Sequence, residues 1–235
     1  MSMLEISALN VFYGELQALF EVKFEVKKGQ KVSLLGANSA GKSTLLKTIS
    51  GIMKPSSGTI SFNGKRIDRL EPHEIIKMGM ALVPEGRKIF SSLTVLENLL
   101  LGSYMPRARK EREKNLETVL SLFPALKGRL KQNGTKLSGG EQQMLSIGRA
   151  LMSKPSFIIF DEISLGLSPV VVKDLYRTVV NLNREGMTVV LVEQDVKRSL
   201  KVADFVYILQ EGKITLKGDP RHISEETVKK AYFGL

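Results

Sequence analysis

Hydrophobic and polar positions follow two different periods along this chain, and together they predict a mixed α/β fold. Residues 4–7 and 19–26 alternate apolar and polar side chains, which is typical of antiparallel strands. Other runs are apolar throughout, as in buried strands, or repeat every three to four positions, as in helices. The predicted strands are 4–7, 19–26, 32–35, 59–62, 81–83, 157–160, 188–192, 205–209 and 213–216. One helix is predicted directly after residue 44, two more cover 140–152 and 170–184, and a C-terminal helix ends near Phe233.

The order of these elements predicts an α/β core with a largely parallel sheet, because strands alternate with helices. Residues 94–125 are helical in pattern, and the segment 92–136 interrupts the alternation. We interpret 92–136 as a helical subdomain inserted between two parts of one core, 1–91 and 137–235. The length of 235 residues is enough for one such domain.

Composition narrows the class of protein. The absence of cysteine excludes disulfides and thiolate metal sites. No apolar stretch is long enough to span a bilayer, and the first five residues lack the pattern of a secretion signal, so we expect a soluble cytoplasmic protein. The net charge of +11 is concentrated between residues 104 and 136. A solvated helix face explains this charge more simply than a patch facing an anionic membrane.

One motif predicts nucleotide binding. Residues 36–44 have the form GxxxxGK[ST] between an apolar strand and a helical pattern, which favours a phosphate-binding loop over an ordinary glycine turn. Its backbone N–H groups and the following helix would bind phosphates, with Lys42 between the β- and γ-phosphates and Ser43 on Mg²⁺. The predicted ATP-binding residues here are Gly36, Ala37, Asn38, Ser39, Ala40, Gly41, Lys42, Ser43 and Thr44.

Two carboxylates follow the apolar strand 157–160. Asp161 could hold Mg²⁺, and Glu162 could polarise a water for in-line attack on the γ-phosphate. A strand followed by a charged turn is the plain alternative, but the phosphate loop in the same chain favours the catalytic interpretation.

A second phosphate-binding design occurs at Ser138, Gly139 and Gly140, where small residues lead into a helix. Ser138 is also a good N-cap residue, and Glu141 has the capping-box position. Both interpretations can hold together.

These motifs resemble one family. GKST, LSGGEQ and FIIFDE, in this order, are similar to the nucleotide-binding subunit of an ABC transporter, and the resemblance covers essentially the whole chain. Further segments resemble one of the two ATPase subunits of branched-chain amino acid importers. They are 82–90, 93–99, 140–145, 147–152, 191–194 and 230–234.

The resemblance implies one nucleotide-binding domain over 1–235: a P-loop, RecA-like core with an antiparallel β-subdomain and an inserted helical subdomain. It implies an ATPase that uses ATP and Mg²⁺ and that drives import through separate membrane-spanning permease subunits, with a solute-binding protein as indirect partner and no nucleic acid. Such a subunit is peripheral, on the cytoplasmic face of the membrane. Two subunits pair head to tail, and each ATP lies between the phosphate loop of one and the signature of the other.

The resemblance also assigns residues. Tyr13 would stack on adenine, although the adjacent Phe12 is an alternative. The signature residues Ser138, Gly139, Gly140 and Glu141 would contact the partner's ATP. The loop Ser164, Leu165, Gly166 and Leu167 would contact the partner subunit.

Four residues depart from the family pattern. Ser39 replaces a glycine, which matters only if that position needs a positive φ. Ile163 replaces a proline, and a β-branched residue tolerates the extended backbone that proline would favour at Glu162. Glu85, a candidate ATP-binding residue and Mg²⁺ ligand, stands in place of glutamine. Gln194, the third predicted catalytic residue with Glu162 and Lys42, stands in place of histidine.

The last two departures predict slow intrinsic hydrolysis, because the Gln194 amide cannot carry a charge and Glu85 adds a negative one. We therefore expect a heterodimer with a histidine-bearing sister subunit, with a homodimer as the alternative. Rival interpretations are an ABC exporter ATPase, a non-transport ABC ATPase acting on DNA or ribosomes, and a nucleotide-gated subunit with negligible turnover.

Overall fold

The computed structural model describes residues 1–233, so the predicted family match at Gly234 lies outside the described residues. The chain divides into two compact units. Unit 1 comprises Met1–Met78 with Gly186–Leu235, and unit 2 comprises Gly79–Glu185. The boundaries predicted for the helical subdomain, 92–136, stay a prediction.

Unit 1 contains an antiparallel sheet with the order β2-β1-β4-β5. Its two long strands exceed the predicted segments because register shifts let the pairing continue past bulged positions, such as Ala8 and Glu21, both with a φ of 46°. Asn63 and Gly64 make the predicted tight turn, with φ values of 50° and 75°. The strands are β1 (Ser2–Tyr13), β2 (Leu16–Lys27), β4 (Ser57–Phe62) and β5 (Lys65–Arg66).

The second sheet of unit 1 is mainly parallel. The central strand β3 (Lys31–Leu35) pairs in parallel with β8 (Thr188–Glu193) and β9 (Phe205–Gln210), and β10 (Lys213–Gly218) pairs antiparallel with β9. The parallel strands are buried almost throughout, as their apolar runs predicted. The other elements are α1 (Lys42–Ile49), α2 (Pro72–Lys77), α9 (Val196–Val202), η2 (Pro220–His222) and α10 (Glu225–Phe233).

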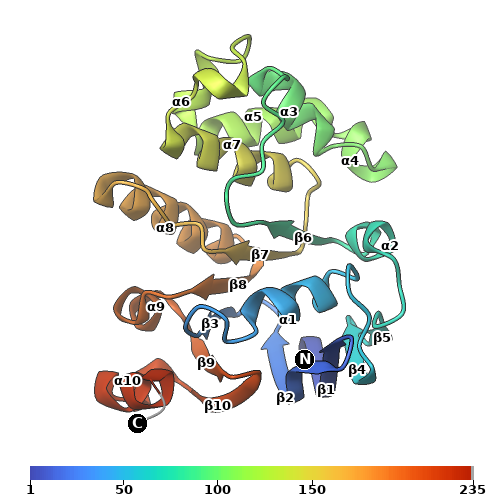
Figure 1. The fold of residues 1–235 in the computed structure, drawn as a ribbon. Helices are drawn as coiled ribbons and strands as arrows, with labels where there is room; N and C mark the ends of the chain where they lie inside the picture. The colour runs from blue at the N-terminus through green and yellow to red at the C-terminus, as the bar shows by residue number, and fades with distance from the viewer. Residues whose placement is uncertain (234–235) are drawn as a thin grey trace. The chain divides into compact units, whose positions relative to one another are not determined.

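Unit 2 combines a parallel strand pair, β6 (Met80–Val83) and β7 (Phe157–Asp161), with most of the helices. Prolines 106 and 124 stand at the first positions of short helices, so the segment 94–125 is divided rather than continuous. Figure 1 shows α7 among the other helices of this unit. These are α3 (Val95–Leu101), α4 (Pro106–Lys110), α5 (Arg112–Leu122), α6 (Pro124–Lys127), η1 (Gly134–Lys136), α7 (Gly139–Leu151) and α8 (Pro169–Arg184).

The packing of α7 depends on a glycine. A Cβ atom built on Gly148 would lie 2.8 Å from Val119 and 2.9 Å from Leu99, so α5 and α3 approach the backbone of α7 itself. The predicted mixed α/β fold, with parallel and antiparallel sheets, is confirmed. Within residues 1–233, no helix combines the length and the apolarity that a membrane crossing requires.

Candidate functional site

The predicted phosphate loop connects β3 to α1 in unit 1, so the strand, loop and helix follow one another as the sequence predicted. Gly41 caps α1 with a φ of 105°, a conformation that side chains rarely adopt, and its carbonyl accepts a hydrogen bond from Leu45 N at 2.9 Å. The first turn of α1 contains no acidic residue, so the partial positive charge of the helix N-terminus would favour an anion there.

Lys42 lies inside this loop. Its Nζ donates hydrogen bonds to the carbonyl oxygens of Gly36 at 2.8 Å and Ala37 at 3.1 Å, and the residue is only 5% exposed. The loop thus holds an ammonium group against its own backbone. Phosphate oxygens could replace these carbonyl acceptors when a nucleotide binds.

Neighbouring strands hold the loop in position. A Cβ on Gly36 would lie 2.5 Å from the carbonyl oxygen of Leu209, so the loop backbone packs directly on β9. Gly212, in the turn between β9 and β10, donates its N–H to Ala40 O at 2.9 Å and accepts one from Phe20 N at 2.9 Å. These contacts fix the loop before any ligand arrives, which reduces the ordering cost of binding.

Ser39 has a φ of 66°, so this position does take the positive φ at which the replacement of glycine by serine matters. A side chain in the left-handed region costs about 1–2 kcal/mol, and Ser39 is therefore strained within the loop.

Replacing Ser39 by glycine is expected to raise the free energy of unfolding by about 0.5–1 kcal/mol, because relief of strain exceeds the entropy cost of glycine. Urea unfolding measures this. Ser50→Gly is the matched control at a φ of −81°, where glycine should destabilise. Equal losses in both variants would contradict the strain at Ser39.

Tyr13 and Phe12 are both exposed, at 46% and 38%. Only the tyrosine reaches the region of α1: its hydroxyl lies 3.3 Å from the Thr44 hydroxyl. This contact places the Tyr13 ring beside the helix that follows the phosphate loop and favours Tyr13 over Phe12 for base stacking, which stays a prediction.

Gln194 lies just after β8, and its side-chain amide donates a hydrogen bond to the Asn38 side chain at 2.8 Å. Sequence reasoning assigned these residues to the phosphates separately and did not foresee their pairing. The contact links the loop to the segment expected to sense the γ-phosphate.

In unit 2, Asp161 ends β7 and Glu162 follows it. Glu162 has a φ of 47°, so its backbone is left-handed and not the extended conformation that a following proline would favour and that isoleucine tolerates. Ile163 explains how the chain permits this: proline at 163 would disfavour helical conformations at the preceding residue, whereas buried isoleucine does not.

The signature residues begin α7, and the predicted capping box is confirmed. Ser138 N donates to the Glu141 carboxylate at 2.8 Å, and Glu141 N donates to the Ser138 hydroxyl at 3.4 Å. Arg129 forms an ion pair with Glu141 at 2.8 Å, so this carboxylate is neutralised locally. Gly140 is required for packing, because a Cβ there would lie 2.9 Å from Val171 of α8.

The loop after Glu162 presents an apolar side chain to solvent. Leu165 is 58% exposed, and Gly166 has a φ of 68°. Ser164 and Leu167 are joined by a backbone hydrogen bond at 3.4 Å, so the loop is a turn. An exposed leucine on an ordered turn suits a contact with another subunit, which stays a prediction.

Glu85 is exposed and begins a strained loop. Gly86, Arg87 and Lys88 have consecutive left-handed φ values of 73°, 66° and 42°. Arg87 is a residue that sequence reasoning missed, since a lone arginine in a loop carries no motif. Within the described residues 1–233, no three acidic or histidine side chains gather as a metal site, so Ser43, Asp161 and Glu85 remain predicted ligands.

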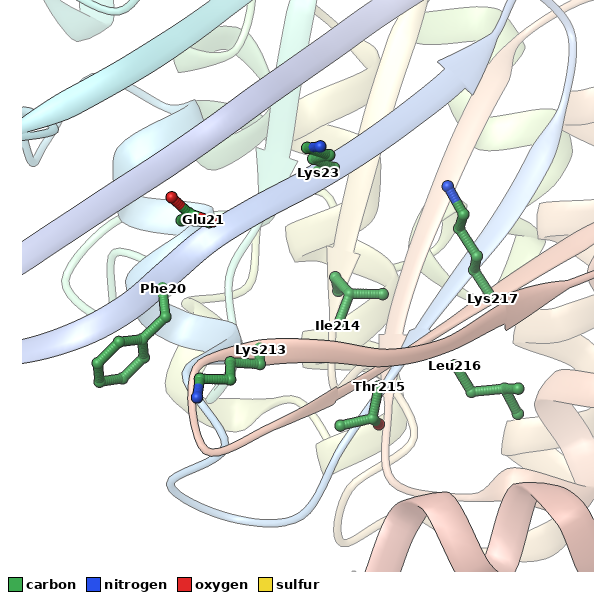
Figure 2. Close-up of a pocket in the computed structure, with 8 residues that line it drawn as sticks. All are labelled: Phe20, Glu21, Lys23, Lys213, Ile214, Thr215, Leu216 and Lys217. Carbon is green, nitrogen blue, oxygen red and sulfur yellow. The ribbon is translucent and has the colours of Figure 1, made fainter.

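Unit 1 also contains an open groove of about 710 Å³ between β2 and β10. Figure 2 shows Lys213 directed toward Phe20, and its Nζ lies 5.2 Å from the ring centroid. None of the predicted site residues lines this groove. The others that do are Glu21, Lys23, Ile214, Thr215, Leu216 and Lys217.

Comparison with known proteins places these features in context. Residues 19–164 match the family model described as ABC transporter. The chain is 44% identical, over 99% of its length and the whole of the relative, to the high-affinity branched-chain amino acid transport ATP-binding protein BraG of Pseudomonas aeruginosa. It is 35% identical to a probable branched-chain amino acid transport ATP-binding protein, LivF, of Archaeoglobus fulgidus, over 99% of both chains. It is 31% identical to the lipopolysaccharide export system ATP-binding protein LptB of Haemophilus influenzae, over the whole chain and 98% of that protein.

Solved structures are similar over nearly the full length. A nucleotide-free ATP-binding cassette from an ABC transporter has a TM-score of 0.86 at 28% identity, covering 98% of this chain and 95% of that one. The ADP conformation of MJ1267, also an ABC transporter cassette, has a TM-score of 0.85 at 29% identity, covering 98% and 94%.

Proposed function

This chain belongs to the ABC transporter family, and on that premise we propose that it is the ATP-hydrolysing motor subunit of an importer for branched-chain amino acids. It has the ABC ATPase fold and is an ATPase of that family. The observation that carries the proposed substrate is the full-length identity of 44% to BraG, compared with 31% to the export protein LptB.

The roles of individual residues follow from their chemistry. Residues 36–44 bind the triphosphate, with Lys42 as the cation, and Tyr13 stacks on the base. Ser43 and Asp161 offer hydroxyl and carboxylate oxygens, the hard donors that Mg²⁺ prefers, and Glu85 adds a third candidate. The ion neutralises phosphate charge when bound. Glu162 accepts the proton of the attacking water, and Gln194 donates its amide N–H toward the γ-phosphate.

ABC ATPases work as dimers with membrane permease subunits. For this chain we propose a head-to-tail pair in which Ser138–Glu141 contacts the partner's ATP and Ser164–Leu167 contacts the partner subunit. The pair works on the cytoplasmic face of the membrane, and a solute-binding protein delivers the amino acid to the permease. The transported solute never touches this chain.

We further propose that the partner is a sister subunit with histidine at the position of Gln194. Gln194→His in this chain is then expected to raise single-turnover hydrolysis about 5- to 10-fold, because an imidazole protonated beside the triphosphate donates a charge-assisted hydrogen bond that the neutral amide cannot. Rapid quench with bound ATP measures this rate. An unchanged rate with unchanged ATP affinity would contradict the asymmetric dimer.

Reconstitution tests the function as a whole. This chain is affinity-tagged in its native host, the membrane proteins that co-purify are reconstituted in liposomes, and ATP-dependent uptake of labelled leucine is measured with the solute-binding protein present. Uptake that fails with Lys42→Ala supports the proposal. Co-purification with no permease, or export in place of uptake, overturns it.

A further inference from the structure

Arg87 lies where no motif assigns a function. The left-handed residues Gly86, Arg87 and Lys88 turn the chain sharply after β6 and bring the arginine against the signature residues, within unit 2. A Cβ atom built on Gly139 would lie 2.9 Å from Arg87 Nη2 and 3.1 Å from its Cζ. The guanidinium thus rests on the bare backbone of the signature glycine.

Two further contacts define the position of this head group. Arg87 Nη1 donates a long hydrogen bond to Gln142 Oε1 at 3.4 Å, and Gln142 is itself held by the carbonyl oxygen of Leu137 at 3.2 Å. On another side, a Cβ on Gly166 would lie 4.0 Å from Arg87 Nη2. The guanidinium therefore lies near both segments that we propose face the partner, the signature and the loop 164–167.

Among the described residues, no acidic side chain forms an ion pair with Arg87. Across the described residues, its side chain makes the hydrogen bond to Gln142 and no ion pair. The nearby acidic signature residue, Glu141, is bound by Arg129. Arg87 is half-buried. A guanidinium has five N–H donors, so most of those of Arg87 have no acceptor among the described residues.

We propose that Arg87 binds the γ-phosphate of the ATP held by the partner subunit and supplies the cation that the signature itself lacks. Ser138, Gly139 and Gly140 offer only a hydroxyl and N–H groups, whereas the ligand between two paired subunits is strongly anionic. A guanidinium presents several donors in a fork that matches phosphate oxygens. This inference rests on the proposed head-to-tail dimer and adds a residue to it.

The geometry also explains why the first residue of α7, at position 139, is a glycine. Any side chain there would displace the arginine head, which is the flexible end of a long side chain. The backbone of Gly139 would tolerate alanine, since its φ is not left-handed. Gly139 thus leaves room for a charge, and its replacement acts through Arg87.

The test uses four variants of the assembled motor: Arg87→Ala, Arg87→Lys, Lys88→Ala and Gln142→Ala. ATP affinity is measured on this chain alone, and kcat and KM for Mg-ATP are measured on the complex. We expect Arg87→Ala to lower kcat about 10- to 100-fold while ATP affinity of the isolated chain stays within twofold. Arg87→Lys should recover part of the rate, because the charge is kept while the forked donor geometry is lost.

The controls separate a charge from a structural contact. Lys88→Ala removes an exposed neighbouring charge and Gln142→Ala removes the hydrogen bond, and both should stay within about threefold of wild type. A loss from Gln142→Ala equal to that from Arg87→Ala, or an Arg87→Ala variant as active as Lys88→Ala, overturns the inference. Failure of the proposed function is distinct, because the reconstituted wild type would then show no ATP-dependent uptake of leucine, whatever the Arg87 variants do to ATP turnover.

Discussion

Replacing Glu162 by glutamine is expected to lower ATP turnover by about 10²- to 10⁴-fold, the range that a general base contributes. The amide has the same size and can form hydrogen bonds, but it cannot accept the proton of the attacking water at neutral pH. Under the proposed function ATP binds at the phosphate loop of unit 1, so ATP affinity should stay within twofold. Steady-state phosphate release and equilibrium binding of a fluorescent ATP analogue measure the two quantities.

Glu185→Gln is the matched control, since this exposed carboxylate follows α8 and lies outside every motif. It should leave turnover unchanged. A Glu162→Gln variant that keeps more than about a tenth of the activity would remove Glu162 from the role of base. Turnover lost together with ATP binding would indicate instead that the left-handed backbone at Glu162 had been disturbed.

Much of the local geometry at the candidate site could be predicted from sequence, because it depends on residues that are neighbours in the chain. The phosphate loop needs only a strand, glycines and a helix in succession, and all three lie within residues 32–49. The capping box of α7 likewise depends on two residues three positions apart, Ser138 and Glu141. In both cases the side chains and the backbone they serve lie within one turn of each other.

The features that sequence missed depend on distant segments. Asn38 and Gln194 are 156 positions apart and meet only because β3 and β8 are adjacent. Arg87 reaches Gly139 only because three consecutive residues take left-handed φ values, and two of them are not glycine. Sequence propensity argues against such a backbone, so tertiary contacts must determine it.

The backbone conformation of Glu162 is a further feature that the sequence did not determine. A proline in the family pattern suggested an extended conformation, yet this chain has isoleucine there and the glutamate is left-handed. The departure at Ile163 was visible in the sequence, but its consequence was not. A residue that merely permits several conformations leaves the choice to packing, here the burial of Ile163.

Replacing Lys42 by alanine is expected to weaken ATP binding about 10- to 100-fold. Its ammonium group is held inside the phosphate loop by two carbonyl oxygens, so it is already positioned for an anion. One charge-assisted hydrogen bond contributes about 1.5–3 kcal/mol, which corresponds to that change in affinity. Isothermal titration with Mg-ATP measures the dissociation constant.

The matched control for this loss is Lys47→Ala, five positions further along the same helix, where the lysine is exposed. This variant removes an equal charge from the surface of α1 and should bind ATP within twofold of wild type, with a modest dependence on salt. Equal losses of ATP affinity in the two variants would mean that Lys42 acts only through its long-range positive charge and not through a direct contact with ATP. A loss confined to Lys42→Ala, with the melting temperature kept, locates the triphosphate at the ammonium group that Gly36 and Ala37 hold.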